Sequence, residues 1–444
     1  MPHSLIALAQ LNPTVGDLAG NAAQIVQAAA AAHAQGAQLL ITAELSLTGY
    51  SPQDLLLRPD FLHACDMALR QLAQDLHAAA PDMQVLVGHP QQDAASTLGH
   101  WDDARAHPPL FNAVSALHGG RITQTWCKQY LPNYGVFDEQ RYFQPASPAQ
   151  PPALLQVAGK QWGVLICEDA WTSAPALACR AAGADALIVL NASPYHAGKA
   201  PERIATMQAL QQHCRLPLVY AHMLGGQDEL LFDGCSFVLA ADGQVLQRGA
   251  AFASDLIFID LLAPFAVKSA WQAPVFEVWP SSPEAEIWQA LVLGLRDYVR
   301  KNGFSRVALG LSGGIDSALV AVLALDALGA DQVHTVMMPS PYTADISWHD
   351  AHELAARCGI AHDEVSIAPA FDALKTSLAP VFGQRPEDVT EENMQARIRG
   401  LMQRARQISP AAYVALLEKR RNIRAQCVDL AKSLGADAYV TLAA

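Results

Sequence analysis

Cys167, Glu44 and Lys128 carry side chains whose chemistry suits cleavage of an amide bond. An amide is a poor electrophile, so a thiolate must first be generated, and a carboxylate within hydrogen-bond reach can take the thiol proton and return it to departing ammonia. Lys128 lies in WCKQYLPNYGVFDEQRYF, a segment rich in aromatic and charged residues. Each residue also has a plainer interpretation, as a buried structural cysteine, an isolated glutamate or a solvated surface lysine.

The elements predicted around these residues place two of them where strands end. Cys167 follows the strand-like run 161–166 and precedes an alanine-rich helical stretch, so we expect it on a turn that exposes its side chain. There the backbone N–H of Glu168 could hold the oxyanion of an attacked amide. Glu44 follows the strand-like run 38–42, at the carboxyl edge where sites of layered α/β proteins collect.

A second candidate site is GLSGGIDSALV, which lies between a strand-like run, 306–311, and a helical run, 316–328. With the next apolar run, 332–337, these predict a βαβ unit and hence a doubly wound parallel sheet. Glycines would let the backbone approach an anion, hydroxyls would donate to it, and the helix N-terminus would supply N–H groups. The alternative is a Gly-Gly turn with serine and aspartate as helix caps. The motif lacks the GK[ST] ending of a Walker loop.

Short apolar runs alternate with alanine-rich helical stretches along the chain, which is typical of α/β layered folds. A proline-rich stretch without a clear period separates the two candidate sites, and we place a domain boundary there. The 444 residues suffice for two buried cores. The predicted parts are a first domain, 1–262, a linker, 263–284, a second domain, 285–402, and a C-terminal tail, 403–444.

The composition favours an enzyme that acts on small molecules. A net charge of −13 would repel nucleic-acid backbones, although a local basic cleft could still hold a nucleotide. No run reaches the roughly 18 apolar residues of a membrane span, and the start lacks a signal-peptide pattern, so we expect a cytoplasmic protein without a membrane partner. The eight cysteines form no CxxC pair and the fifteen histidines no HExxH motif, so we expect reduced thiols, no prosthetic group and no zinc.

Three blocks around the first site resemble, in this order, the signature blocks of the nitrilase superfamily and specifically of its NAD-synthetase glutaminase branch: AELSLTGYSPQDLLL, KQYLPNYGVFDEQRYF and GVLICEDAW. The resemblance implies an αββα sandwich in which Glu44 is the general base, Cys167 the nucleophile and Lys128 a cation that stabilises the tetrahedral oxyanion. Glu139 would be a supporting carboxylate near the lysine.

The resemblance also implies a glutamine-binding region in VLNASPYHAGKAPER. Ser193 and Lys199 would bind the α-amino and α-carboxylate groups of glutamine, and Tyr134 would line the pocket. Ordinary loop residues at these three positions are the alternative.

The segment SGGIDS resembles the pyrophosphatase loop of enzymes that adenylate a carbonyl oxygen, and later blocks such as NMQARIRGLM are close to the NAD synthetase pattern. The resemblance implies a domain of the adenine nucleotide alpha hydrolase type that uses ATP and Mg²⁺, with Asp316 helping to hold the metal and Met338 near the adenine. The implied ATP contacts are Gly310, Ser312, Gly313, Gly314, Asp316, Ser317 and Met338. The implied contacts to deamido-NAD⁺ are Asn393, Arg397 and Arg399.

The resemblance extends over residues 3–402 and stops there. Where the family continues with a strand and a TGNKSE-type loop, this chain has a basic tail, so we expect the second domain to be incomplete at its C-terminus. On that expectation glutamine hydrolysis persists, whereas NAD⁺ synthesis is weak or absent.

The sequence is compatible with three functions. The first is glutamine-dependent NAD⁺ synthesis by a homo-oligomer, in which ammonia from glutamine amidates deamido-NAD⁺ while ATP goes to AMP and pyrophosphate. The second is a stand-alone nitrilase-type glutaminase or amidase with a non-functional synthetase remnant. The third is a nucleotide-sensing or scaffold protein, against which the retention of all three triad residue types argues.

Overall fold

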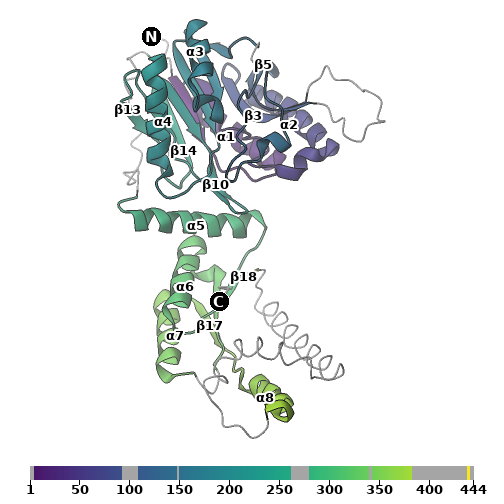
Figure 1. The fold of residues 1–444 in the computed structure, drawn as a ribbon, viewed down its shortest axis with the longest axis vertical. Helices are drawn as coiled ribbons and strands as arrows, with labels where there is room; N and C mark the ends of the chain where they lie inside the picture. Colours follow the sequence, from purple (N-terminus) through teal and green to yellow (C-terminus); the bar gives the residue numbers. More distant parts are fainter. Residues whose placement is uncertain are drawn as a thin grey trace. The chain divides into compact units, whose positions relative to one another are not determined.

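The computed structural model of the chain describes residues 5–92, 109–147, 150–261, 280–339, 343–382 and 438–440 (Figure 1). The chain forms two compact units, Met1–Gly294 and Leu295–Ala444. Within the described residues the α-helices are α1 (Leu18–Ala34), α2 (Pro59–Ala79), α3 (Ser173–Ala181), α4 (Lys199–Cys214), α5 (Pro283–Lys301), α6 (Ile315–Leu328), α7 (Asp345–Cys358) and α8 (Ala368–Phe382). The strands of the first unit are β1 (Leu5–Gln10), β2 (Ala37–Ile41), β3 (Gln84–Gln92), β4 (Leu110–His118), β5 (Arg121–Cys127), β6 (Leu154–Val157), β7 (Lys160–Ile166), β8 (Ala186–Asn191), β9 (Leu218–His222), β10 (Leu224–Gln227), β11 (Leu230–Asp233), β12 (Phe237–Leu239), β13 (Val245–Arg248) and β14 (Asp255–Asp260). Those of the second unit are β15 (Val307–Gly310), β16 (Val333–Met337), β17 (Ala361–Glu364) and β18 (Ala438–Val440).

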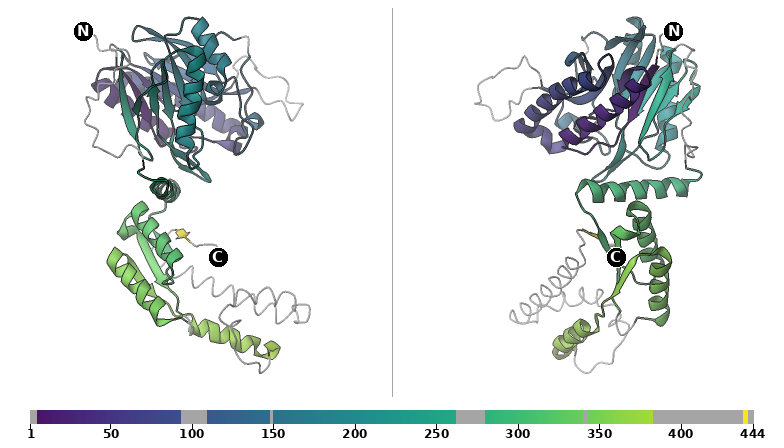
Figure 2. Two further views of the ribbon diagram at one scale, coloured as in Figure 1. Left: turned by 60° about the vertical axis from the view of Figure 1, so that its left-hand side comes forward. Right: turned by 180° about the vertical axis from the view of Figure 1, so that it is seen from behind.

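The first unit is a sandwich of two six-stranded sheets with helices on both outer faces (Figures 1 and 2). The strand orders are β14-β1-β2-β3-β4-β5 and β13-β12-β9-β8-β7-β6, and β10 and β11 form a separate hairpin. Helices α1 and α2 pack on the first sheet, and α3 and α4 on the second. The predicted αββα sandwich is confirmed.

Alternation along the strands explains why two sheets pack face to face. In β1, Ile6 and Leu8 point into the cluster between the sheets, whereas Ala7 and Ala9 point toward α1 and α2. The small alanines let the helices approach the sheet closely. Both faces of the central strands are buried, so their sequences are apolar throughout, as parallel strands covered on both faces require.

The second unit contains a parallel four-stranded sheet in the order β17-β16-β15-β18. The succession β15, α6, β16 is the βαβ unit predicted from the sequence, and the parallel α/β class of this unit is confirmed. Ala438–Val440 pairs with β15, although the sequence beyond residue 402 predicts no strand of this sheet. Among the described residues, every helix is too short or too polar to cross a bilayer.

A glycine in β3 lets the segment that carries Glu44 lie directly on the sheet. A Cβ added at Gly88 would lie 2.3 Å from the backbone nitrogen of Leu45 and 2.7 Å from the carbonyl oxygen of Ala43. The N–H of Leu47 donates to the Gly88 carbonyl at 3.1 Å, which fixes this close approach. The position of Glu44 therefore depends on the missing side chain at Gly88.

We predict that Gly88→Ala lowers the free energy of unfolding by roughly 1–3 kcal/mol, because the new methyl group meets backbone atoms that cannot move aside. Urea unfolding followed by circular dichroism measures this. The control is Gly294→Ala in α5, where the nearest atom to an added Cβ is Leu231 Cδ1 at 3.8 Å. That change should be neutral or stabilising. Equal stability of the two variants would contradict the prediction.

Candidate active site

A buried lysine at the end of β5 joins two carboxylates, Glu44 after β2 and Glu139 in the loop that follows β5. The Nζ atom of Lys128, just after β5, lies 2.7 Å from Glu44 Oε1 and 2.8 and 2.9 Å from the two oxygens of Glu139. All three side chains are buried. Burial alone would lower the pKa of Lys128, but the facing carboxylates of Glu139 and Glu44 raise it well above its ordinary value. Lys128 is therefore a permanent cation in the folded protein.

Further donors fix the direction of both carboxylates. Asn112 Nδ2 donates to Glu44 Oε1 at 2.7 Å, and the backbone N–H of Ala192 donates to Glu44 Oε2 at 3.0 Å. The hydroxyl of Tyr50 donates to Glu139 Oε1 at 2.9 Å. Glu44 is thus held by groups from both sheets, which leaves its carboxylate a single orientation.

Cys167 begins a short 3₁₀ turn, η3 (Cys167–Ala170), directly after β7. Its φ of 47° lies in the left-handed region, a strained conformation that persists only where the surroundings impose it. The expectation that this turn exposes the thiol is wrong, because the side chain is 2% exposed and joins the core cluster between the two sheets.

The electrostatic surroundings of Cys167 decide its resting state. Burial raises the pKa of the thiol well above its ordinary value, and the charge of Glu44 raises it further, while Lys128 opposes both. The thiol is therefore neutral at rest. Its proton must be removed by a base in the site before it can attack.

Asp169 ties the cysteine turn to the lysine segment. Its Oδ1 accepts the backbone N–H groups of Gln129 and Tyr130, both at 2.9 Å, and its Oδ2 accepts that of Ile166 at 3.2 Å. These donors flank Lys128 and Cys167. One buried carboxylate therefore sets the distance between the predicted nucleophile and the predicted cation.

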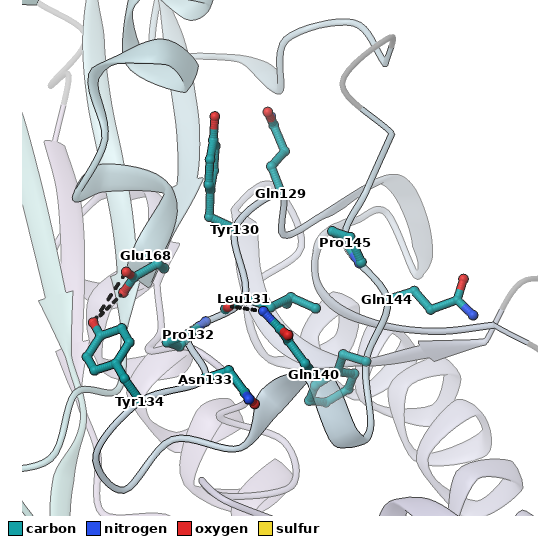
Figure 3. Close-up of a pocket in the computed structure, with 11 residues that line it drawn as sticks. Gln129, Tyr130, Leu131, Pro132, Asn133, Tyr134, Gln140, Gln144, Pro145 and Glu168 are labelled. Atoms are coloured by element: carbon teal, nitrogen blue, oxygen red, sulfur yellow. Dashed lines mark hydrogen bonds between the residues drawn. The ribbon is translucent and has the colours of Figure 1, made fainter.

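A cavity of about 790 Å³ opens beside this cluster. Figure 3 shows the hydroxyl of Tyr134 facing the carboxylate of Glu168, the residue that follows Cys167, and the two distances are 3.1 and 3.3 Å. Gln140 closes another part of the wall by donating to the Leu131 carbonyl at 3.2 Å. The cavity is lined by Gln129, Tyr130, Leu131, Pro132, Asn133, Tyr134, Gln140, Phe143, Gln144, Pro145 and Glu168.

The other two predicted glutamine ligands, Ser193 and Lys199, lie between the end of β8 and the start of α4, outside the residues that line this cavity. Ser193 is buried and directly follows Ala192, which contacts Glu44. Lys199 begins α4, pairs with Glu202 at 2.8 Å, and places Nζ 4.8 Å from the centre of the Trp171 ring.

In the second unit, the two predicted serines, Ser312 and Ser317, contact each other within the predicted phosphate loop. Ser317 Oγ lies 3.0 Å from Ser312 Oγ and accepts the Ser312 N–H at 3.1 Å. Gly313 has a φ of 78°, and a Cβ there would lie 2.1 Å from the Ser347 carbonyl oxygen, so this position requires glycine. The predicted adenine contact Met338 packs against Gly310: a Cβ added at Gly310 would lie 3.3 Å from Met338 Cε.

Asp316 lies in the first turn of α6, where its exposed carboxylate is available to a cation. Across the described ranges, no group of three or more His, Cys, Asp and Glu side chains is arranged to hold a metal ion. The predicted contacts Asn393, Arg397 and Arg399 lie outside the described residues.

Each of the two units matches a known protein family. A carbon-nitrogen hydrolase family model matches residues 5–263, and an NAD synthase model matches residues 287–411. The glutamine-dependent NAD(+) synthetase of Acinetobacter baylyi is 39% identical over 398 residues, which cover 89% of this chain and 69% of that protein. The one from Rhodobacter capsulatus is 45% identical over 399 residues, with 89% and 68% covered. The chain belongs to the glutamine-dependent NAD⁺ synthetase family.

A solved structure of the glutamine-dependent NAD⁺ synthetase from Acinetobacter baumannii, in complex with ADP, superimposes with a TM-score of 0.77 at 36% identity. The alignment covers 90% of this chain and 71% of that one. The family resemblance seen in the sequence is confirmed, and of the three competing functions the findings favour the first. As a member of this synthetase family the chain is a ligase with a nitrilase-type first domain.

Several residues that organise this NAD⁺ synthetase site were missed at the level of sequence. Tyr50 and Asp169 stand inside the blocks AELSLTGYSPQDLLL and GVLICEDAW, so the resemblance itself could have drawn attention to them. Asn112 lies within β4 and outside every recognised block. Its role follows only from the register that places β4 beside Lys128.

We predict a pH-dependent stability difference between the wild type and Asp169→Asn. Burial, opposed by the N–H donors, raises the pKa of Asp169 from 3.8 to about 6. A carboxyl with a raised folded-state pKa favours folding below about pH 4, and this contribution is lost as the pH rises through 6. The difference between the two pKa values corresponds to roughly 3 kcal/mol.

Asn does not titrate, so the wild type should lose roughly this much free energy of unfolding relative to Asp169→Asn between pH 4 and pH 7. Other titrating groups cancel in the difference. Urea unfolding of both proteins at several pH values is the measurement, and parallel pH profiles would count against the assignment.

Proposed function

We propose that this chain hydrolyses glutamine at Cys167 and uses the released ammonia to amidate deamido-NAD⁺ at an ATP-dependent second site. The observation that carries the proposal is the buried contact of Lys128 with Glu44 and Glu139 beside a neutral thiol on a strained turn. Such a cluster combines a base, a cation and a nucleophile out of contact with bulk water, which is what amide cleavage requires.

In the proposed first step, Glu44 takes the Cys167 proton as the sulfur attacks the glutamine side-chain carbonyl and a C–S bond forms. Lys128 and the backbone N–H of Glu168 stabilise the oxyanion. The tetrahedral intermediate then collapses, the C–N bond breaks, and Glu44 returns the proton to ammonia. A thioester to Cys167 is left, and water activated by Glu44 hydrolyses it to glutamate and free thiol.

Groups from the cavity wall, and from the segment between the end of β8 and the start of α4, are proposed to contact the rest of glutamine. Tyr134 lines it, and its partner Glu168 offers a carboxylate of the right charge for an α-ammonium group. Ser193 and Lys199 are proposed for the α-groups of glutamine, the cationic Lys199 for the carboxylate.

The second unit is proposed to activate deamido-NAD⁺ with ATP. The carboxylate of deamido-NAD⁺ attacks the α-phosphate of ATP, and pyrophosphate leaves. Ammonia then displaces AMP from the adenylated carboxyl group. The loop hydroxyls and N–H groups bind phosphate oxygens, with Met338 beside the adenine. The exposed carboxylate of Asp316 fits a role in holding Mg²⁺, which would neutralise phosphate charge.

The remaining parts of the proposal rest on the family resemblance. Asn393, Arg397 and Arg399 would contact deamido-NAD⁺. The proposed domains are 1–262 and 285–402, with 263–284 as linker and 403–444 as a tail. We also propose that the chain forms a homo-oligomer and works in the cytoplasm.

Cys167→Ala should lose glutamine-dependent NAD⁺ formation by at least about 10²-fold, because no other group can form the thioester. Ammonium chloride should restore synthesis in this variant, since the second site uses free ammonia. The measurement is NAD⁺, AMP and glutamate production from glutamine, ATP and deamido-NAD⁺. Glutamate release by the alanine variant would refute Cys167 as nucleophile. Glutamate release without NAD⁺ by the wild type would instead support the weak or absent NAD⁺ synthesis expected from the sequence and favour a stand-alone glutaminase.

Gly313→Ala should abolish AMP formation while glutamine hydrolysis continues. The added methyl group would meet the backbone of Ser347 at 2.1 Å and deform the phosphate loop. Gly303→Ala is the matched control, because Gly303 has a similar φ of 75° with nothing within 4 Å of an added Cβ. If both variants make AMP equally well, the loop is not the ATP site.

A further inference from the structure

A buried ion pair that the proposed mechanism does not use lies close to Glu44. Arg203, in α4, is 1% exposed and donates through both terminal nitrogens to the carboxylate of Asp233 at the end of β11, with an Nη1–Oδ2 distance of 3.2 Å. Burial alone would raise the pKa of Asp233, but the Arg203 guanidinium holds it well below its ordinary range. Both groups are therefore charged inside the first unit.

The third nitrogen of the same guanidinium, Nε, donates toward the active site. Arg203 Nε lies 3.1 Å from Ser193 Oγ, and Ser193 directly follows Ala192, whose N–H holds Glu44 Oε2 at 3.0 Å. The contacts run without a break from Asp233 through Arg203 to Ser193, and along one peptide unit to the N–H that orients Glu44.

The other neighbours of the pair fix the same segment. His222, at the end of β9, lies with Nε2 3.4 Å from Asp233 Oδ1 and Nδ1 3.3 Å from the Asn191 carbonyl oxygen. Burial and the nearby Arg203 lower the pKa of His222 to about 4, so it is neutral near pH 7. Met223 N donates to the same Asn191 carbonyl at 3.2 Å. The strand end before Ala192 is thus tied to the strand beside it.

Stability alone does not account for these two charges. Replacing a buried ion pair with apolar side chains of similar size is often neutral or stabilising, because the desolvation cost disappears with the charges. What an apolar pair cannot do is fix a direction. A guanidinium presents its N–H donors in one rigid plane, so Asp233 on one edge determines where Nε points on the other.

We propose that the Arg203–Asp233 pair is a positioning device for the general base: it fixes the segment 192–193 after β8 so that the Ala192 N–H holds Glu44 in the orientation that takes the Cys167 proton. This rests on the proposed glutaminase function. Arg203 touches none of the reacting atoms and acts through Ser193 and Ala192. Its loss should therefore slow thiol activation and turnover at saturating glutamine, in addition to any change in glutamine binding through Ser193.

The test uses the full-length protein with three sets of substitutions. Arg203→Met combined with Asp233→Leu removes both charges and leaves neither one buried alone. Arg203→Lys keeps a cation facing Asp233 but lacks the separate Nε donor. The matched control is Arg70→Met with Asp66→Leu, because this pair has the same two-point contact, at 2.9 and 3.1 Å, on the exposed face of α2.

Three quantities are measured for each protein: the melting temperature, the kcat for glutamine hydrolysis, and the rate at which iodoacetamide alkylates Cys167, read by peptide mass spectrometry. Alkylation needs no glutamine contacts, so it reports thiol activation even if the wild type fails to hydrolyse glutamine. Such a failure would overturn the proposed function and leave this comparison intact.

The proposal predicts a melting temperature close to wild type for the Met/Leu protein, with kcat and the Cys167 alkylation rate both lowered about tenfold or more, since small misplacement of a catalytic group is costly. Arg203→Lys should also lower kcat and the alkylation rate. The exposed control, Arg70→Met with Asp66→Leu, should change neither of these two quantities. A folded Met/Leu protein with native kcat and native alkylation overturns the proposal, as does a loss confined to KM. If the Met/Leu protein does not fold, native alkylation in Arg203→Lys overturns it instead.

Discussion

The first unit is organised around one constraint: a single buried ammonium group must satisfy two carboxylates. Lys128 lies within 2.9 Å of oxygens from both Glu44 and Glu139, and one cation cannot balance two buried anions without further donors. Tyr50 and Asn112 supply them, one for each carboxylate. Because every one of these groups stands at a strand or loop fixed by the core, the sandwich must form correctly before the cluster can.

The sandwich meets this constraint by bringing strand ends together. Glu44 follows β2 and Lys128 follows β5 in one sheet, whereas Cys167 follows β7 in the other. The apolar cluster between the sheets sets their separation, and the thiol is part of that cluster. Its burial keeps the sulfur protonated, so the same packing that forms the core also makes a base necessary.

The sequence predicts most of the fold because its strands are apolar runs of the right length and its helices are rich in alanine. It also predicts Glu44, Lys128 and Cys167 as site residues, since three multi-residue blocks carry them. What sequence cannot supply is the set of buried polar contacts between distant segments. The pairing of Arg203 with Asp233 depends on how α4 packs beside a hairpin, and no local pattern encodes it.

The burial of the thiol was missed for the same physical reason. A strand-to-helix turn specifies where the backbone of Cys167 goes, but which side of the sheet the side chain faces depends on its φ of 47°. That conformation is imposed by neighbours such as Asp169, which accepts the Ile166 N–H at 3.2 Å. Local sequence predicts the turn, and tertiary contacts decide its direction.

In the proposed mechanism, glutamine is cleaved through a thioester on Cys167, whose formation depends on the contact between Lys128 and Glu44. The most direct measurement is acid quenching of the protein during turnover with glutamine, followed by mass spectrometry of its proteolytic peptides. We expect a glutamyl adduct on the peptide that contains Cys167 and on no other cysteine peptide. Glutamate release without an adduct there, or an adduct on a different cysteine, would contradict it.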